Sequence, residues 1–80
     1  MEEKLIQIIK KMTGVDFEDR NDLRDTNLFS DKIGLCPRDL VALCVTVAEE
    51  FGINIKEVNL NLTKFDTFNH ILLIVKRYGN

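Results

Sequence analysis

The two cysteines and the single histidine are the side chains best suited to bind a metal or act as nucleophiles. Cys36 and Cys44 are eight residues apart, which on one helix is about 12 Å of rise at roughly 1.5 Å per residue. Because a disulfide requires Cα atoms within about 7 Å, an intrachain bridge is not expected. Two cysteines and one histidine are also too few for a zinc site. His70 has no cysteine or acid at ligand spacing, so we predict a surface histidine.

Acidic residues concentrate between residues 16 and 31. Their order does not follow the ligand positions of an EF-hand, and no glycine stands at the turning point, so we predict a solvated loop rather than a calcium site. The chain contains no Gly-rich phosphate loop, nucleophile elbow or His-Glu-x-x-His helix. The sequence therefore predicts neither a metal site nor an enzyme.

Length and charge limit the remaining possibilities. Eighty residues allow one domain, residues 1–80. The net charge of −2, with 11 scattered Lys and Arg residues, argues against nucleic acid, whose binding depends on neutralising phosphates. No apolar run is long enough to span a membrane. The first residues are acidic and lack the basic start of a secretory signal, which predicts a cytoplasmic protein.

Apolar periodicity predicts an all-α fold. Residues 2–12, 37–51 and 67–78 carry apolar side chains three and four apart, as main helices do, and residues 56–59 form a short helix. Gly14, Gly52 and Gly79 mark the three helix ends, and Pro37 suits a first helical turn. The expected core is Leu5, Ile9, Leu28, Leu40, Leu43, Val47, Phe51, Ile71 and Val75.

Residues 15–35 form a long connection without helical periodicity. A connection of this length is uncommon in a compact domain unless it has a function. It nevertheless contains several apolar side chains, and we therefore predict that it packs over the bundle. These anchors are Val15, Phe17, Leu23, Leu28, Phe29, Ile33 and Leu35.

This order of elements resembles the acyl carrier proteins over nearly the whole chain. Five stretches carry the resemblance: 25–29 (Asp-Thr-Asn-Leu-Phe), 33–35 (Ile-Gly-Leu), 39–43 (Asp-Leu-Val-Ala-Leu), 49–53 (Glu-Glu-Phe-Gly-Ile) and 65–68 (Phe-Asp-Thr-Phe). The resemblance implies an acyl-carrier-like bundle of three main helices plus one short helix, with the long loop between the first and second helices.

The attachment site of the family is altered in this chain. Acyl carrier proteins begin their second helix with Asp-Ser-Leu and attach 4′-phosphopantetheine to that serine. The matching positions are Cys36, Pro37 and Arg38, and the one serine, Ser30, lies upstream in the loop. Because proline has no side-chain nucleophile, the resemblance implies a carrier scaffold with no cofactor.

Cys36 allows two interpretations. At a helix N-terminus the dipole and free N–H groups favour the thiolate, so this thiol could accept an acyl group directly. Alternatively, Cys36 is a small residue tolerated beside a helix cap. Cys44 lies on the inward stripe of the same helix and is predicted to be part of the core.

The second helix carries a second apolar strip beside its inward stripe: Val41, Ala42, Val45 and Ala48. If exposed, such a strip is typically a contact site; alternatively, the long loop covers it. The family usually presents acidic residues here, whereas this chain retains Asp39, Glu49 and Glu50. Arg38 adds a positive charge at the head of the strip. The predicted partner-binding residues are Arg38, Asp39, Val41, Ala42, Val45 and Glu49.

Three functions fit these features. The first is a docking module that binds carrier-recognising enzymes through the second helix; the resemblance implies a setting in fatty-acid, polyketide or peptide-maturation machinery. The second is a carrier loaded at an atypical residue such as Cys36. The third is a helical binding protein that dimerises through the strip from Val41 to Val45, although we expect a monomer.

Overall fold

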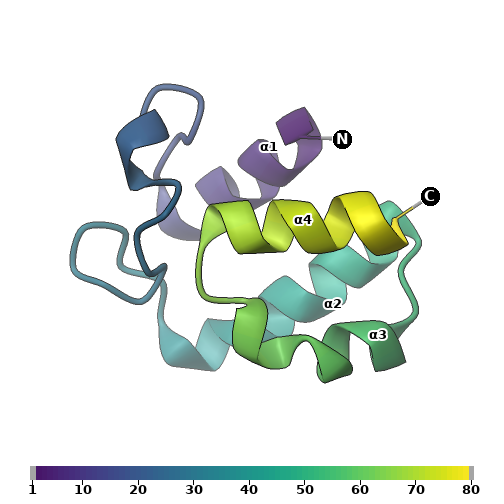
Figure 1. Cartoon of the computed structure of the whole chain (residues 1–80). Helices are drawn as coiled ribbons and strands as arrows, with labels where there is room; N and C mark the ends of the chain where they lie inside the picture. The colour runs from purple at the N-terminus through teal and green to yellow at the C-terminus, as the bar shows by residue number, and fades with distance from the viewer. Residues whose placement is uncertain (1, 80) are drawn as a thin grey trace.

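The computed structural model describes residues 2–79, which fold into four α-helices joined by turns (Figure 1). The helices are α1 (Glu2–Thr13), α2 (Leu40–Phe51), α3 (Ile55–Leu60) and α4 (Phe68–Tyr78). Three short 3₁₀ turns accompany them: η1 (Asn21–Leu23), η2 (Pro37–Asp39) and η3 (Leu62–Lys64). No strand occurs within residues 2–79, so the predicted all-helical class is confirmed.

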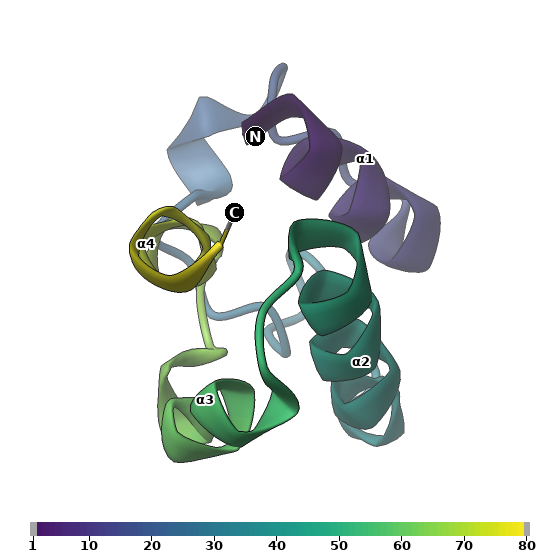
Figure 2. The ribbon, with the colours of Figure 1, turned by 90° about the vertical axis from the view of Figure 1, so that its right-hand side faces the viewer.

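The helices pack around one core. Figure 2 looks along α4 and shows α1 and α2 on one flank, with α3 below α4. Contacts between α1 and α2 and between α2 and α3 connect the bundle, and the long loop from α1 to α2 closes the side opposite the two chain ends (Figure 1).

The predicted ends of the first two main helices are confirmed by glycine caps. Gly14 follows α1 with φ of +79°, and its N–H donates to the carbonyl of Lys10 at 2.7 Å. Gly52 follows α2 with φ of +65°, and the next N–H, of Ile53, donates to the carbonyl of Ala48 at 2.9 Å. Both glycines adopt the left-handed conformation that ends a helix with little strain.

Helix α4 begins at a side-chain cap. Thr67 is extended and buried, and its Oγ1 accepts a hydrogen bond from the N–H of His70 at 3.2 Å. This bond satisfies one of the four N–H groups that lack intrahelical partners. Lys76 and Arg77 lie in the last turn, where positive charge is favourable to the helix dipole.

Replacing the cap should measurably destabilise the domain. We expect Thr67→Ala to lower the free energy of unfolding by about 1 kcal/mol, the usual effect of losing a threonine cap. Urea unfolding followed by circular dichroism measures this loss. Thr67→Ser keeps the hydroxyl and should retain most of the stability; equal destabilisation by both substitutions would show that the cap contributes little.

Eight of the nine predicted core residues are buried: Leu5, Ile9, Leu28, Leu43, Val47, Phe51, Ile71 and Val75. Leu40 is the exception, because it begins α2 at the edge of the bundle and packs only partly against the core. The prediction also omitted the largest buried side chains, Phe17, Phe65 and Phe68, which come from the loop, the segment after η3 and the start of α4.

Phe17 and Phe68 join the long loop to α4. Their rings stack with centroids 4.8 Å apart, and the Arg24 guanidinium lies 4.8 Å from the centroid of the Phe68 ring. Arg24 also donates from Nε to the carbonyl of Phe17 at 3.2 Å and pairs with Glu2 of α1. One arginine thereby connects the loop, α1 and α4.

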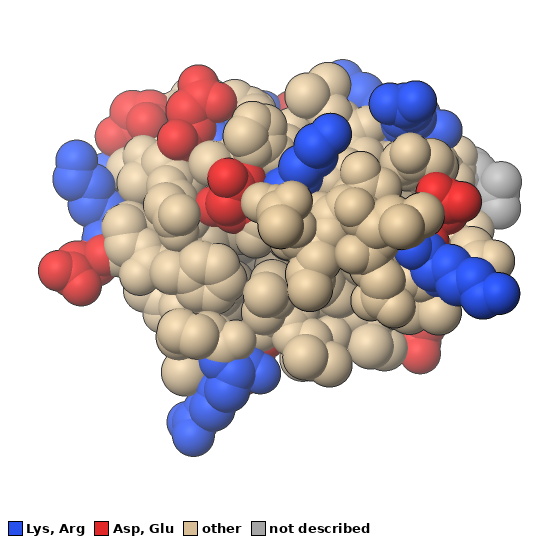
Figure 3. All heavy atoms as spheres, turned by 60° about the horizontal axis from the view of Figure 1, so that its bottom comes forward, with Lys and Arg blue, Asp and Glu red and all other residues tan. Residues whose placement is uncertain are grey.

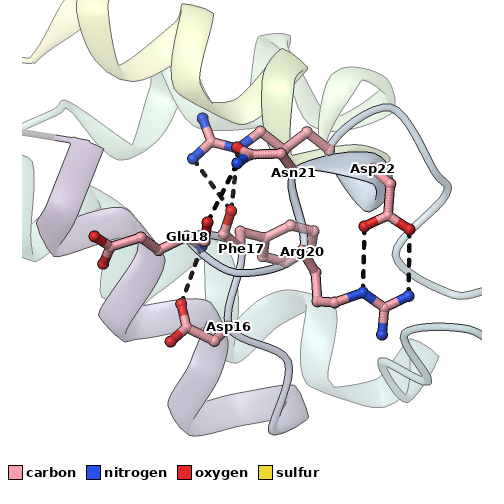
Figure 4. A network of polar contacts seen from close by, with 7 residues as sticks. Asp16, Phe17, Glu18, Arg20, Asn21 and Asp22 are labelled. Carbon is pink, nitrogen blue, oxygen red and sulfur yellow. Dashed lines mark hydrogen bonds and ion pairs between the residues drawn. The ribbon is translucent and has the colours of Figure 1, made fainter.

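The loop packs against the bundle, as predicted. Phe17, Leu23, Leu28, Ile33 and Leu35 are buried, and Val15 and Phe29 pack partly against the core. The acidic part of the loop forms local turns (Figure 4). Asp16 accepts the N–H of Glu18 at 3.0 Å, and Asp22 pairs with Arg20 at 3.2 Å. Asp22 thus stabilises a turn within the loop, whereas Asp16 also pairs with Lys10 of α1 at 3.5 Å and so connects the loop to that helix.

Candidate functional site

The start of α2 presents an exposed proline at the position where the family resemblance expects a serine. Pro37 is the first residue of η2, preceded by Cys36 in an extended conformation and followed by the exposed Arg38. The N–H of Asp39 donates to the carbonyl of Cys36 at 2.8 Å, which fixes this turn. The backbone is therefore arranged as a helix start, but its exposed side chain has no group that can be acylated or phosphorylated.

The two cysteine thiols and the single serine hydroxyl are partly or fully buried. Cys36 is half-buried, and Cys44 is buried in the core, as predicted, where burial raises the pKa of its thiol. Neither cysteine forms a disulfide. The hydroxyl oxygen of Ser30 is covered and has no hydrogen-bond partner within residues 2–79. Ser30 is thus not an accessible substitute for a serine at position 37.

The outward side of α2 is open to solvent. Val41 is 71% exposed, Val45 is 41% exposed and Ala42 is exposed, so the loop does not cover them. Ala48 was predicted to belong to the same strip, and this is wrong. It follows Cys44 by one helical turn and therefore lies on the inward side, where it is buried.

The apolar strip continues from α2 onto α3. A groove of about 410 Å³ lies between them, lined by Val45, Ala48, Glu49, Gly52, Ile53 and Ile55. Ile55, the first residue of α3, is 44% exposed. We call Val41, Ala42, Val45, Glu49 and Ile55 the α2–α3 surface. Figure 3 shows the molecule from the side of α3, with uncharged atoms over much of this face and single charged side chains among and around them.

Three charged side chains lie on or beside the α2–α3 surface: Glu49 belongs to it, and Arg38 and Asp39 precede it at the start of α2. None has an ion-pair partner within residues 2–79. Glu50, which was expected among the outward acids, instead pairs with Lys4 of α1 at 3.0 Å. The structure thus brings the six predicted partner-binding residues to the beginning and outer side of one helix and adds Ile55. Ile55 was not among the predicted residues because the short helix was expected to begin at residue 56. Asn54, whose side chain caps α3 by accepting from Lys56 N, was the available signal.

His70 is exposed, as predicted, but the expectation that no acid lies at ligand spacing from it is wrong. Asp66 precedes it by four residues, and its Oδ1 is 2.6 Å from His70 Nδ1. This hydrogen bond to His70 lowers the pKa of the Asp66 carboxyl below its ordinary value. The pair fixes the entrance to α4 beside the Thr67 cap.

The Asp66–His70 pair predicts a small pH dependence. Because the pKa of Asp66 is lower in the folded protein, its contribution to stability is present above the unfolded-state pKa and is lost as the pH falls through the folded value. We expect an NMR titration of the Asp66 carboxyl to give a pKa that rises in His70→Ala. An unchanged pKa in that variant would show that the pair does not form in solution.

No family model, curated protein or solved structure matches this chain. None of the helices between residues 2 and 79 has the length and apolar character required to cross a membrane. Within the same residues, His, Cys, Asp and Glu do not gather into a group of three that could hold a metal ion.

Proposed function

We propose that this protein is an acyl-carrier-like docking module that binds carrier-recognising enzymes through the α2–α3 surface and bears no prosthetic group. The observation that carries the proposal is the combination, on one helix, of an exposed proline at its start and an uncovered apolar strip along its outer side. The proline has no hydroxyl to which a prosthetic group could be attached, whereas the apolar strip provides a surface for contact with another protein.

The residues of the surface indicate what kind of partner would bind. Val41, Val45 and Ile55 are exposed around a groove, so a partner gains by removing their apolar area from water. Asp39 and Glu49 lie beside these apolar side chains and have no ion-pair partner within residues 2–79. Their carboxylates therefore favour basic side chains on the partner. The expected partner surface is therefore an apolar patch with a basic border.

The order of elements supports a carrier-like role for this surface. A long loop with buried anchors leads into η2 and α2, and a short α3 precedes α4. The family resemblance implies the same order and places the recognition face on the second helix. It also supplies the biosynthetic setting, which is fatty-acid, polyketide or peptide-maturation machinery.

Binding to enzymes that normally recognise carriers tests the proposal. We would titrate the ¹⁵N-labelled chain with a phosphopantetheinyl transferase, a ketosynthase and a peptide-synthetase condensation domain. At least one should shift the amide signals of α2 and α3. Val45→Asp should weaken that binding about tenfold or more, because it puts a charge at the centre of the apolar contact.

A matched substitution distinguishes a surface effect from a general one. Leu73→Asp places the same charge on an exposed apolar residue of α4, outside the α2–α3 surface, and should leave the binding unchanged. Absence of binding to all three enzymes would contradict the proposal, as would equal loss in both variants. Sedimentation at increasing protein concentration tests the competing dimer; a dimer broken by Val45→Asp would assign the surface to self-association instead.

A further inference from the structure

A second groove lies on a different face of the molecule, between α4 and the segment that joins α3 to η3. Its volume is about 610 Å³, and it is lined by Asn61, Lys64, His70, Leu73, Ile74, Lys76, Arg77 and Tyr78. Figure 1 shows α4 lying above α3, with the chain running in nearly opposite directions in the two helices. The groove shares no lining residue with the one beside α2.

One side of α4 lines this groove, and its apolar part consists of Leu73 and Ile74. His70, Leu73, Ile74 and Arg77 follow the i, i+3, i+4, i+7 spacing of a single helix face. Ile74 is buried, whereas Leu73 is 63% exposed although it lies inside the groove. An exposed leucine between polar walls is suited to contact with an apolar side chain of another molecule.

The charged residues in the lining of this groove are all basic. Lys64 lies on the η3 side, and Lys76 and Arg77 lie on the α4 side. None of the three has an ion-pair partner among residues 2–79, whereas Lys4, Lys10, Arg20 and Arg24 elsewhere are paired. The acid nearest in sequence to the lining residues of α4, Asp66, is bonded to His70. A chain of net charge −2 thus carries a locally positive groove.

The positions of these basic residues favour an elongated ligand that lies along α4. From His70 to Arg77 the lining extends over eight residues of α4, which is seven steps and about 10 Å along the helix axis at roughly 1.5 Å per residue. Basic groups stand on both walls rather than around one point, so they match acidic residues on both sides of an apolar stripe. An amphipathic helix with that pattern docks its apolar face into such grooves.

We propose that the groove between α4 and η3 binds an acidic amphipathic helix of a partner protein. Leucine or similar side chains of that helix contact Leu73 and Ile74, and its carboxylates pair with Lys64, Lys76 and Arg77. This interaction is separate from docking through the α2–α3 surface, so one chain could connect two partners.

The test uses the whole chain and a synthetic helical peptide of about four turns. The peptide has leucines at i, i+3, i+4 and i+7, flanked on both sides by glutamates. Titrated into the ¹⁵N-labelled chain, it should shift amide signals of α4 and η3 and bind more weakly as salt rises from about 0.05 to 0.5 M. A second peptide with lysine in place of each glutamate should not bind.

Charge reversal within the groove supplies the decisive comparison. Lys64→Glu with Lys76→Glu should raise the Kd at least tenfold, while Lys11→Glu with Lys32→Glu, the same charge change outside the groove, should leave it within twofold. All four lysines are exposed, so each variant should keep the dispersed spectrum of a folded protein. The Val45→Asp variant should bind the peptide normally, which separates this inference from the proposed function.

Several outcomes would overturn the inference. The inference is contradicted if millimolar peptide shifts no amide signals, or if it shifts only those of α2 and α3. It is also contradicted if the lysine peptide binds equally well, or if the two double variants lose affinity to the same extent. Two further measurements cover other occupants. Binding of phosphatidylglycerol vesicles but not of the peptide would assign the groove to a membrane surface, and a self-association lost in Lys64→Glu with Lys76→Glu would assign it to a second copy.

Discussion

Phe68→Ala is expected to lower the free energy of unfolding by about 3–5 kcal/mol, the usual effect of truncating a buried phenylalanine. The Phe68 ring is fully buried, stacks on Phe17 and lies against the Arg24 guanidinium. Its removal leaves a cavity and abolishes the two contacts, with Phe17 and Arg24, that join the long loop to α4. A domain of this size has a total stability of about 4–12 kcal/mol, so the loss is a large fraction of the whole.

Urea unfolding at 25 °C, followed by circular dichroism, measures this effect. Leu73→Ala provides the control on the same helix: Leu73 is mostly exposed, and its truncation should change the stability by less than about 0.5 kcal/mol. If Phe68→Ala unfolded at the same urea concentration as the parent, the contact between the loop and α4 would not be part of the folded protein.

Leu28→Ala is expected to lower the free energy of unfolding by about 2–5 kcal/mol, although the residue lies outside every helix. The Leu28 side chain is fully buried. Its N–H donates to the carbonyl of Asp66 at 2.7 Å, and its carbonyl accepts from the N–H of Leu35 at 2.9 Å. The backbone of Leu28 therefore joins two parts of the loop, residues 28 and 35, and also joins the loop to the segment that precedes α4.

Hydrogen exchange in the loop reports on the same contact. In Leu28→Ala the amides of residues 28 and 35 should exchange faster relative to those of α1 than they do in the parent, because the loop opens before the helices. Leu60→Ala removes the same group from an exposed position and should leave both stability and exchange unchanged. Parent-like behaviour of Leu28→Ala would show that the loop is not anchored there.

The helices were predictable because their signals are local. Spacing of three and four identified the buried sides, and Gly14 and Gly52 identified the ends of α1 and α2, because each glycine caps the helix directly before it. The burial of Leu40 was overestimated for a related reason: periodicity gives the direction of a side chain, but not its distance from the end of the bundle.

The contacts between distant segments were not predictable in the same way. Phe17 stacks on Phe68 across 51 positions, and Arg24 joins them to Glu2. Such pairs arise from the course of the loop, which has no periodicity. Apolar composition showed that the loop packs, but only the path of the chain determines which aromatic rings meet.

The candidate site was predicted in part. The outward direction of Val41 and Val45 follows from helix geometry, and the structure leaves both exposed. Ala48 was placed on the wrong side because it lies at the border between the two stripes of α2. The groove along α4 was missed because Lys64 and Arg77 belong to different elements, and only the folded chain brings them to one groove.

The central claim is that a carrier-like scaffold acts here without a carried group, and intact mass spectrometry tests it most directly. The protein would be incubated with coenzyme A and a promiscuous phosphopantetheinyl transferase, beside a Cys36→Ala variant and a working acyl carrier protein as positive control. We expect an unchanged mass for the protein and its variant, while the control gains one phosphopantetheine arm. A gain of that arm by the protein would contradict the claim, and its loss in Cys36→Ala would identify the thiol as the attachment point.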